Sequence, residues 1–188
     1  MQTIKNDKLK IVILAWQRCG TGHLESIARH SLNWNISHQS LERIFLDQKE
    51  YKLYGAVRHP YDRFLSFFSG FVLSTQKSNL HYISNPYNWS KQDAELFFNR
   101  FANTMHYDPH TAFQQYLFRN LNSPVEFNYI DHKDIDVICG GESYKHKTNP
   151  IWKQFSKSMD KEIIDYITTK SKELYASDIE WYKKLNLL

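Results

Sequence analysis

Near the N-terminus, six consecutive residues have types that could bind an anion: Arg18, Cys19, Gly20, Thr21, Gly22 and His23. They follow an apolar run at residues 10–16 and precede apolar residues at helical spacing, which predicts a strand, a glycine-containing loop and a helix. The backbone N–H groups and the dipole at such a helix start favour a phosphate or a similar anion. A plain tight turn explains the same residues equally well.

This loop lacks the features of a metal-assisted phosphoryl-transfer site. No Gly-Lys-Ser/Thr sequence follows its glycines and no obvious magnesium ligands are visible, which argues against an ATPase or a kinase. Sulfuryl transfer can proceed without a metal, because the transferring group carries less charge and cationic side chains can stabilise the transition state. The sequence therefore predicts an anion site without a metal.

A second group of residues has a more specific spacing. Arg58 follows an apolar run at residues 53–57, Pro60 comes two residues later, and Ser66 lies eight residues beyond Arg58. Proline is tolerated in the first turn of a helix, so the segment predicts a strand end, a turn and a helix start. The structural alternative is that Arg58 pairs with a carboxylate and Ser66 faces a helix groove.

Residues 57–66 resemble the second phosphate-binding motif of the sulfotransferases that use 3′-phosphoadenosine 5′-phosphosulfate (PAPS). The resemblance implies that Arg58 and Ser66 bind the 3′-phosphate, which distinguishes PAPS from ATP and remains in the product adenosine 3′,5′-bisphosphate. Residues 18–23 are then similar to the family's first motif, which surrounds the 5′-phosphosulfate. Arg18 stands where the family has a lysine, so the resemblance implies that Arg18 is a catalytic cation. Its side chain presents a planar fork in place of a compact ammonium group.

Other segments resemble the Golgi carbohydrate sulfotransferases, which include the chondroitin and HNK-1 enzymes and, more distantly, the heparan 2-O type. Residues 108–110, followed by Gln114, are similar to one of their motifs, although two positions of that motif differ. Residues 127–138 are similar to their third core strand and the helix after it, and Tyr175 with Asp178 to their closing segment. The resemblance implies sulfuryl transfer to a hydroxyl or amine acceptor, for which sugar, peptide and small molecule stay open.

Transfer to an acceptor also needs a base. In the heparan-type enzymes a catalytic histidine precedes the second motif, and His38 lies close to that place. Histidine suits the role because its unperturbed pKa lies near working pH. The resemblance implies His38 as the base, and His23, His110 and Glu42 are the alternatives.

A glycine- and lysine-bearing loop at residues 141–150 carries Lys145 and Lys147. The loop resembles a segment that closes over the nucleotide in the family, which implies that both lysines contact the donor. A charged loop that is merely solvated is the alternative.

The elements that must position these residues alternate along the chain. Strands are predicted at residues 10–16, 53–57 and 125–130, and helices after residues 22, 60, 90 and 160. Strands that alternate with helices predict an α/β fold with a mostly parallel central sheet covered on both faces. With the resemblance, this implies a three-layer sandwich of the P-loop-like sulfotransferase type, with the donor across the carboxyl ends of the strands.

For two of these helices, the sequence also predicts which residues are buried. The helix after Pro60 is expected to bury four aromatic residues, Phe64, Phe67, Phe68 and Phe71. Ser90 and Asp93 have capping-box spacing ahead of the next helix, whose predicted apolar face holds Leu96, Phe97 and Phe101. The polar residues 76–89 between these helices predict a surface loop.

Composition bounds the class of protein. The 188 residues suit one domain spanning residues 1–188, and a 41% hydrophobic content excludes a disordered chain. The net charge of +4 is scattered, so no nucleic-acid partner is predicted, and Cys19 and Cys139 have no metal-ligand spacing. No apolar run suits a signal peptide or a membrane anchor, which favours the cytoplasm. A nucleotide-dependent kinase and a catalytically silent PAPS-binding or nucleic-acid-binding protein are the alternative functions.

Overall fold

The computed structural model describes residues 1–36, 50–73, 85–119, 121, 127–140, 150–185 and 187. Its internal contacts divide the chain into two compact units. The sheet unit comprises Met1–His59, Gln114–His146 and Lys183–Leu188, and the helical unit comprises Pro60–Phe113 and Lys147–Tyr182. The division does not test the single domain predicted for residues 1–188, which stays a prediction.

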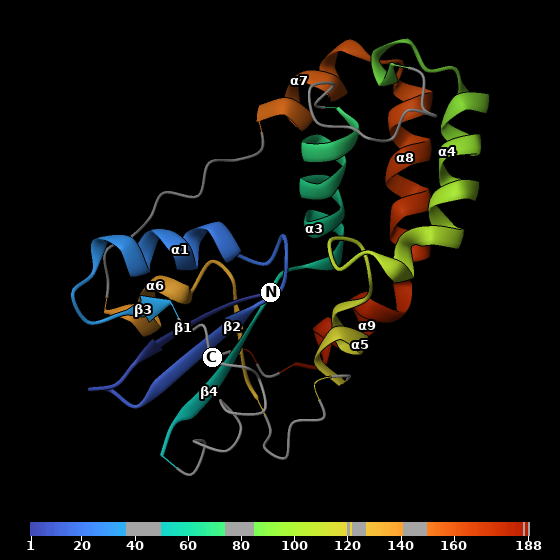
Figure 1. Ribbon diagram of the computed structural model, residues 1–188. Coiled ribbons are helices and arrows are strands. Elements are labelled where there is room, and N and C mark those ends of the chain that lie inside the picture. Colours follow the sequence, from blue (N-terminus) through green and yellow to red (C-terminus); the bar gives the residue numbers. More distant parts are fainter. Residues whose placement is uncertain are drawn as a thin grey trace. The chain divides into compact units, whose positions relative to one another are not determined.

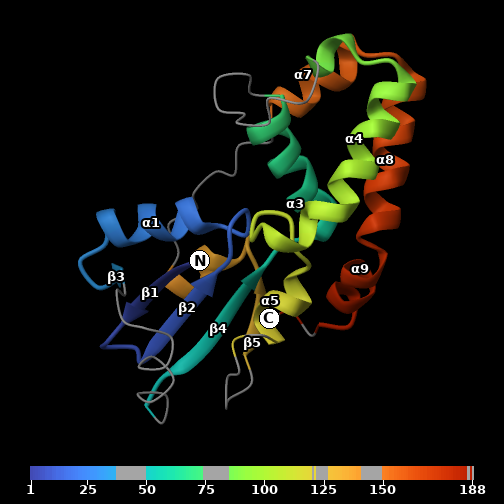
Figure 2. The ribbon, with the colours of Figure 1, turned by 45° about the vertical axis from the view of Figure 1, so that its right-hand side comes forward.

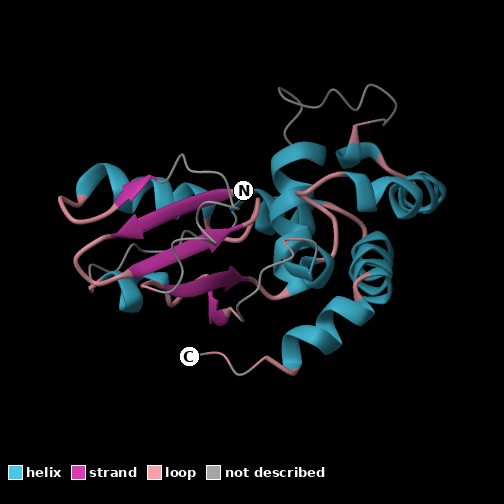
Figure 3. Cartoon of the chain, turned by 60° about the horizontal axis from the view of Figure 1, so that its bottom comes forward, coloured by secondary structure: helices cyan, strands magenta, loops and turns pink. Residues whose placement is uncertain are grey.

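Within the described residues, a five-stranded sheet forms the centre of the sheet unit (Figures 1 and 3). In pairing order, its strands are β3 (Asn35–Ile36), β1 (Gln2–Asn6), β2 (Ile11–Ala15), β4 (Lys52–Val57) and β5 (Asn128–Asp131). The predicted α/β class is confirmed, and β2, β4 and β5 run parallel. The sheet as a whole is mixed, because β1 is antiparallel to both of its neighbours.

The antiparallel pairing of β1 follows from a tight turn directly after it. The side-chain oxygen of Asn6 accepts hydrogen bonds from the backbone N–H groups of Lys8 (3.1 Å) and Leu9 (2.9 Å). Asparagine side chains that bind the backbone a few residues on stabilise such turns, so the chain reverses at once into β2. The sequence analysis missed β1 because polar neighbours hide its buried residues Thr3 and Ile4.

Both faces of this sheet are covered by the helices α1 (Thr21–His30), α5 (Gln114–Arg119) and α6 (Ile135–Cys139). On one face, apolar residues of α1 and α6 pack in one cluster with Ala56 of β4. On the other face, a side chain at Gly55 would lie 2.8 Å from the Phe118 ring of α5. Neighbouring residues of a strand point to opposite faces, so Gly55 and Ala56 mark the two sides.

The described part of the helical unit consists of helices and turns, and α4 and α8 lie side by side (Figures 1 and 2). Its elements are α3 (Pro60–Phe67), the π-helical turn η2 (Phe68–Val72), the 3-10 turns η3 (Pro86–Asn88) and η4 (Met105–Tyr107), α4 (Lys91–Thr104), α7 (Pro150–Ser158), α8 (Lys161–Leu174) and α9 (Ala176–Lys183). α3 begins at Pro60 as predicted. α8 begins after Asp160, whose side chain accepts a hydrogen bond from the Glu162 N–H group (2.9 Å).

α4 begins with the predicted capping box. The Ser90 hydroxyl accepts from the Asp93 N–H group (3.2 Å), and the Asp93 carboxylate accepts from the Ser90 N–H group (2.8 Å). The predicted apolar face is wrong at Leu96, which is 49% exposed, whereas Phe97 and Phe101 are buried. Successive helical residues are turned by about 100°, so Leu96 leaves the face on which its neighbour Phe97 lies.

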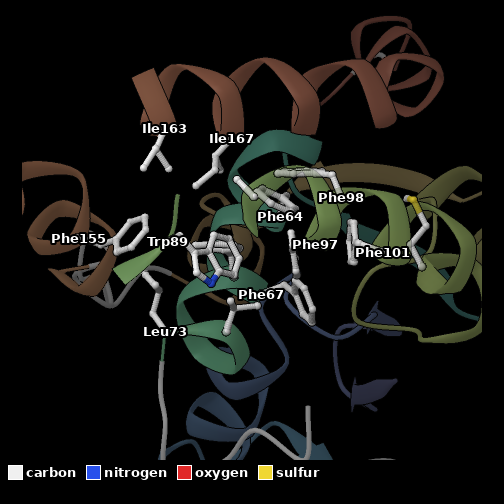
Figure 4. Close-up of a cluster of buried hydrophobic side chains, with 14 of the residues drawn as sticks. Phe64, Phe67, Leu73, Trp89, Phe97, Phe98, Phe101, Phe155, Ile163 and Ile167 are labelled. Atoms are coloured by element: carbon white, nitrogen blue, oxygen red, sulfur yellow. The ribbon is translucent and has the colours of Figure 1, made fainter. Parts of the chain in front are cut away.

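The core of the helical unit is mostly aromatic (Figure 4). Three of the four phenylalanines predicted to be buried after Pro60 are so, namely Phe64, Phe67 and Phe68, whereas Phe71 is only partly buried. Trp89, predicted in a surface loop, is only 3% exposed and packs against Phe68 and Phe97. Trp89 has polar neighbours in the sequence, so its burial was not predicted. Residues 76–84 of that loop lie outside the described residues.

Candidate functional site

The loop predicted to bind an anion joins β2 to α1 and has an uncommon backbone at two positions. Arg18 has a φ of 65° and Gly20 a φ of 102°, both in the left-handed region. A turn in which the Cys19 N–H group donates to the Trp16 carbonyl (2.9 Å) leads the chain toward the helix start. The left-handed region costs a non-glycine residue about 1–2 kcal/mol. Such strain gathers at functional sites, which marks the loop as a candidate.

Gly20 and Gly22 serve different purposes in this loop. A Cβ atom at Gly20 would lie 2.9 Å from the Cδ1 atom of Ile135, so φ and packing both require glycine there. A Cβ atom at Gly22 would meet no described atom within 4 Å. No described side chain caps α1. The helix start therefore offers backbone N–H groups, which lack partners inside a helix, beside the open side of Gly22.

The second predicted anion loop begins at Arg58, the first residue after β4. β2 and β4 are parallel neighbours, so both loops leave the same edge of the sheet. Arg58 Nη1 donates to the backbone carbonyl of Arg18 at 3.4 Å, although the residues lie 40 positions apart. Both arginines are half-buried. Two cations and the start of α1 thus gather in one place, an arrangement that favours an anion with more than one charged group.

A buried glutamine joins these two loops, and the sequence analysis did not identify it as a site residue. Gln114 is fully buried. Its side-chain oxygen accepts from the Arg58 N–H group (2.9 Å) and the Cys19 thiol (3.0 Å), and its nitrogen donates to the Arg58 carbonyl (2.7 Å). The only signal in the sequence was its place beside residues 108–110 in the family resemblance.

Two histidines near this edge of the sheet lie close to carboxylates. His23 Nε2 lies 2.5 Å from Asp136 Oδ1 of α6, and the two side chains are 5% and 13% exposed. His132 follows β5, with its Nδ1 atom 2.9 Å from Asp131 Oδ1 and its Cβ atom 3.6 Å from the position of a Cβ at Gly20. The sequence analysis did not assign Asp136 to the site, because pairing with His23 across 113 positions leaves no local pattern.

Other predicted site residues belong to the helical unit. Ser66 lies in α3 and is half-buried. Its predicted partner Arg58 belongs to the sheet unit, so the pairing stays a prediction. His110, an alternative base, has its Nδ1 atom 2.6 Å from Asp108 Oδ1 and its ring against Phe71. When Nδ1–H donates to a carboxylate, Nε2 is the proton-accepting atom of the ring, so His110 stays a candidate.

The segment that precedes α5 is held by two buried side chains of the helical unit. The Arg63 guanidinium donates to the carbonyls of Ala112 (2.5 Å) and Pro109 (2.6 Å). The Tyr175 hydroxyl donates to the Thr111 carbonyl (2.5 Å), and burial raises its pKa, so it stays protonated. Tyr175, part of the closing segment in the family resemblance, therefore fixes the backbone just ahead of Gln114.

Four predicted site residues lie outside the described residues: His38, Glu42, Lys145 and Lys147. Their roles stay predictions. In the described ranges, no group of three or more His, Cys, Asp or Glu residues could hold a metal ion. In the same ranges, no helix is long and apolar enough to cross a membrane. Neither Cys19 nor Cys139 forms a disulfide, and burial raises the pKa of Cys139 to about 12.

The chain matches no protein-family model, no curated protein and no solved structure. Its site is therefore interpreted from its own residues. In the sheet unit, the buried amide of Gln114 joins Arg58 to Cys19, and the Arg58 side chain donates to the backbone of Arg18 in the loop before α1. Such a set can bind and orient an anion that carries two charged groups.

Proposed function

We propose that this protein is a sulfotransferase that moves a sulfuryl group from PAPS to a hydroxyl or amine acceptor. The observation that carries the proposal is the meeting of two predicted anion loops after β2 and β4, where Arg58 binds the Arg18 backbone. In open α/β sheets, ligands bind outside the carboxyl ends of the parallel strands. The parallel order of β2, β4 and β5 also supports the finer proposal of a three-layer, P-loop-like sandwich.

In this proposal the two loops divide the donor between them. Arg58 binds the 3′-phosphate together with Ser66, because a guanidinium makes charge-assisted hydrogen bonds that a nucleotide without this phosphate cannot receive. The 5′-phosphosulfate is bound by the backbone N–H groups of Gly20, Thr21, Gly22 and His23. Lys145 and Lys147 add positive charge over the nucleotide. The open side of Gly22 is the observation that supports close approach of an anion to this backbone.

The chemical roles follow from charge. When bound, PAPS supplies the sulfuryl group and leaves as adenosine 3′,5′-bisphosphate. Arg18 offsets the negative charge that builds on the leaving phosphate oxygen. His38 takes the proton of the acceptor, with His23, His110 and Glu42 as alternatives. Much of the rate gain comes from aligning the acceptor with the sulfur.

Calorimetric titration with three nucleotides tests the proposal. Adenosine 3′,5′-bisphosphate should bind at least about 30-fold more tightly than AMP, because a charge-assisted contact worth ~2 kcal/mol is lost in AMP. Tightest binding of ATP with magnesium would favour the kinase alternative, and equal affinity for AMP and the bisphosphate would reject a PAPS site. An acceptor screen with sulfur-labelled PAPS in the presence of EDTA then tests for metal-independent transfer.

A further inference from the structure

Gln114 is the first residue of α5 and is fully buried in the sheet unit. An amide side chain can accept hydrogen bonds through its oxygen and donate them through its nitrogen. Gln114 does both, and its partners belong to the two loops that leave β2 and β4. It is therefore placed to control how these loops lie relative to each other.

The bonds to Arg58 take the place of a neighbouring strand. At this end of the sheet, the His132 N–H group donates to the Val57 carbonyl (2.7 Å). One residue further on, the N–H and C=O groups of Arg58 both bind the Gln114 amide, at 2.9 and 2.7 Å. Hydrogen bonds at both the N–H and the C=O group of a residue fix its backbone. The backbone in turn restricts the direction of the side chain.

The bond to Cys19 ties the same amide to the other loop. Cys19 is fully buried, and its thiol lies 3.0 Å from the Gln114 oxygen that also accepts the Arg58 N–H group. Both loops thus meet at one atom. An ionised glutamate could not donate to the Arg58 carbonyl, and asparagine is one methylene shorter, so neither side chain makes the full set of bonds.

We infer that Gln114 is a positioning residue: its buried amide fixes Arg58 against the loop of residues 18–23 and so sets the separation of the two anion-binding groups. The effect on ligand affinity rests on the proposed function. The joining of the two loops does not, because it concerns only bonds within the chain. The two parts can therefore be tested separately.

The test uses two substitutions of Gln114 and one matched control. Gln114→Leu removes every side-chain hydrogen bond at similar volume, whereas Gln114→Glu keeps the accepting oxygen and loses the donor. The control is Asn128→Leu, because Asn128 also donates from an amide to the β4 backbone, at Leu53 (3.2 Å), far along the strand from Arg58. All variants carry Cys139→Ala, so that Cys19 is the only thiol.

Two readouts report on the loops without any ligand: hydrogen exchange at the Arg58 amide and alkylation of Cys19 by iodoacetamide. In Gln114→Leu both rates should rise at least about tenfold, because the N–H group and the thiol lose their shared acceptor. In Gln114→Glu, which keeps that acceptor, exchange at Arg58 should rise by less than about threefold. In Asn128→Leu both rates should match the parent.

Ligand affinity separates a positioning role from a merely structural one. Both Gln114 variants should bind adenosine 3′,5′-bisphosphate at least about tenfold more weakly, since Gln114→Glu also sets a negative charge against the Arg58 carbonyl. In an Arg58→Ala background the further loss should stay below about threefold, because a residue that acts through the Arg58 side chain has nothing left to position.

Unchanged exchange and alkylation rates in Gln114→Leu, or equal increases in Asn128→Leu, would overturn the inference. A loss of affinity that is the same with and without the Arg58 side chain would also overturn it. If Gln114→Leu does not fold, Gln114→Glu decides through the Arg58→Ala background. A parent protein that does not bind the bisphosphate rejects the proposed function alone, because exchange and alkylation still decide whether Gln114 joins the loops.

Discussion

The two glycines of the loop after β2 separate stability from ligand binding. Gly20→Ala puts a Cβ atom on a residue with a φ of 102°, which costs about 1–2 kcal/mol. The new atom would also lie 2.9 Å from Cδ1 of Ile135, which is fully buried. Overpacking of this kind costs roughly another 1 kcal/mol. We therefore expect Gly20→Ala to lower the free energy of unfolding by about 2–3 kcal/mol.

Gly22→Ala should behave in the opposite way. Gly22 lies inside α1, and its added methyl group meets no described atom within 4 Å. Alanine is the better helix former, so the free energy of unfolding should stay unchanged or rise by up to about 1 kcal/mol. The same methyl group would occupy the open side of the proposed phosphate loop. Bisphosphate affinity should therefore fall about tenfold, or ~1.4 kcal/mol.

Urea denaturation followed by tryptophan fluorescence measures the stability of both variants against wild type, and calorimetry measures their nucleotide affinity. The reasoning from backbone conformation is refuted if Gly20→Ala is as stable as wild type. The reasoning about the open side of the helix start is refuted if Gly22→Ala binds the bisphosphate as wild type does. Both variants change only one glycine to alanine, so each serves as the control for the other.

Three further outcomes follow from contacts elsewhere in the chain. Ser90→Ala breaks the capping box with Asp93 and should lower the free energy of unfolding by about 1 kcal/mol in urea denaturation; no change would contradict the role of the cap. Arg63→Met leaves one buried and one partly buried carbonyl without their donor and should cost roughly 3 kcal/mol, whereas a variant as stable as wild type would show that Arg63 does not hold that segment. The hydrogen bond from Tyr51, followed by that from Lys5, lowers the pKa of Asp7, so its stabilising effect is present above the unfolded pKa of 3.8 and is lost at lower pH. The stability difference between wild type and Asp7→Asn should therefore shrink as pH falls below about 4, and a difference that grows would have the wrong sign.

The sequence predicted those elements whose signals are local. A run of β-branched residues gave β2, Pro60 marked the start of α3, and Ser90 with Asp93 marked α4. β1 was not predicted because polar residues surround its buried positions, and the strand forms by pairing with β2. Because β1 was not predicted, the sheet was expected to be mostly parallel, whereas the antiparallel β1 makes it mixed.

The candidate site was predictable only where residues that can bind an anion directly follow a predicted strand. The loop of residues 18–23 and Arg58 each follow a predicted strand, so their shared edge could be foreseen from parallel order. The partners that hold them could not. Gln114 and Asp136 reach the loops across long stretches of sequence, and a glutamine or an aspartate has no pattern of its own that distinguishes such a partner from a surface residue.

The most direct test of the central claim is the ratio of affinities for adenosine 3′,5′-bisphosphate and AMP, measured by calorimetry in wild type and in Arg58→Ala. Arg119→Ala, an exposed arginine in α5, is the matched control. We predict that Arg58→Ala weakens binding of the bisphosphate by about 2 kcal/mol, roughly 30-fold, and leaves the affinity for AMP nearly unchanged. The preference for the bisphosphate is then lost in Arg58→Ala and kept in Arg119→Ala. A preference that survives in Arg58→Ala, or that wild type lacks, would contradict the assignment of Arg58 to the 3′-phosphate of PAPS.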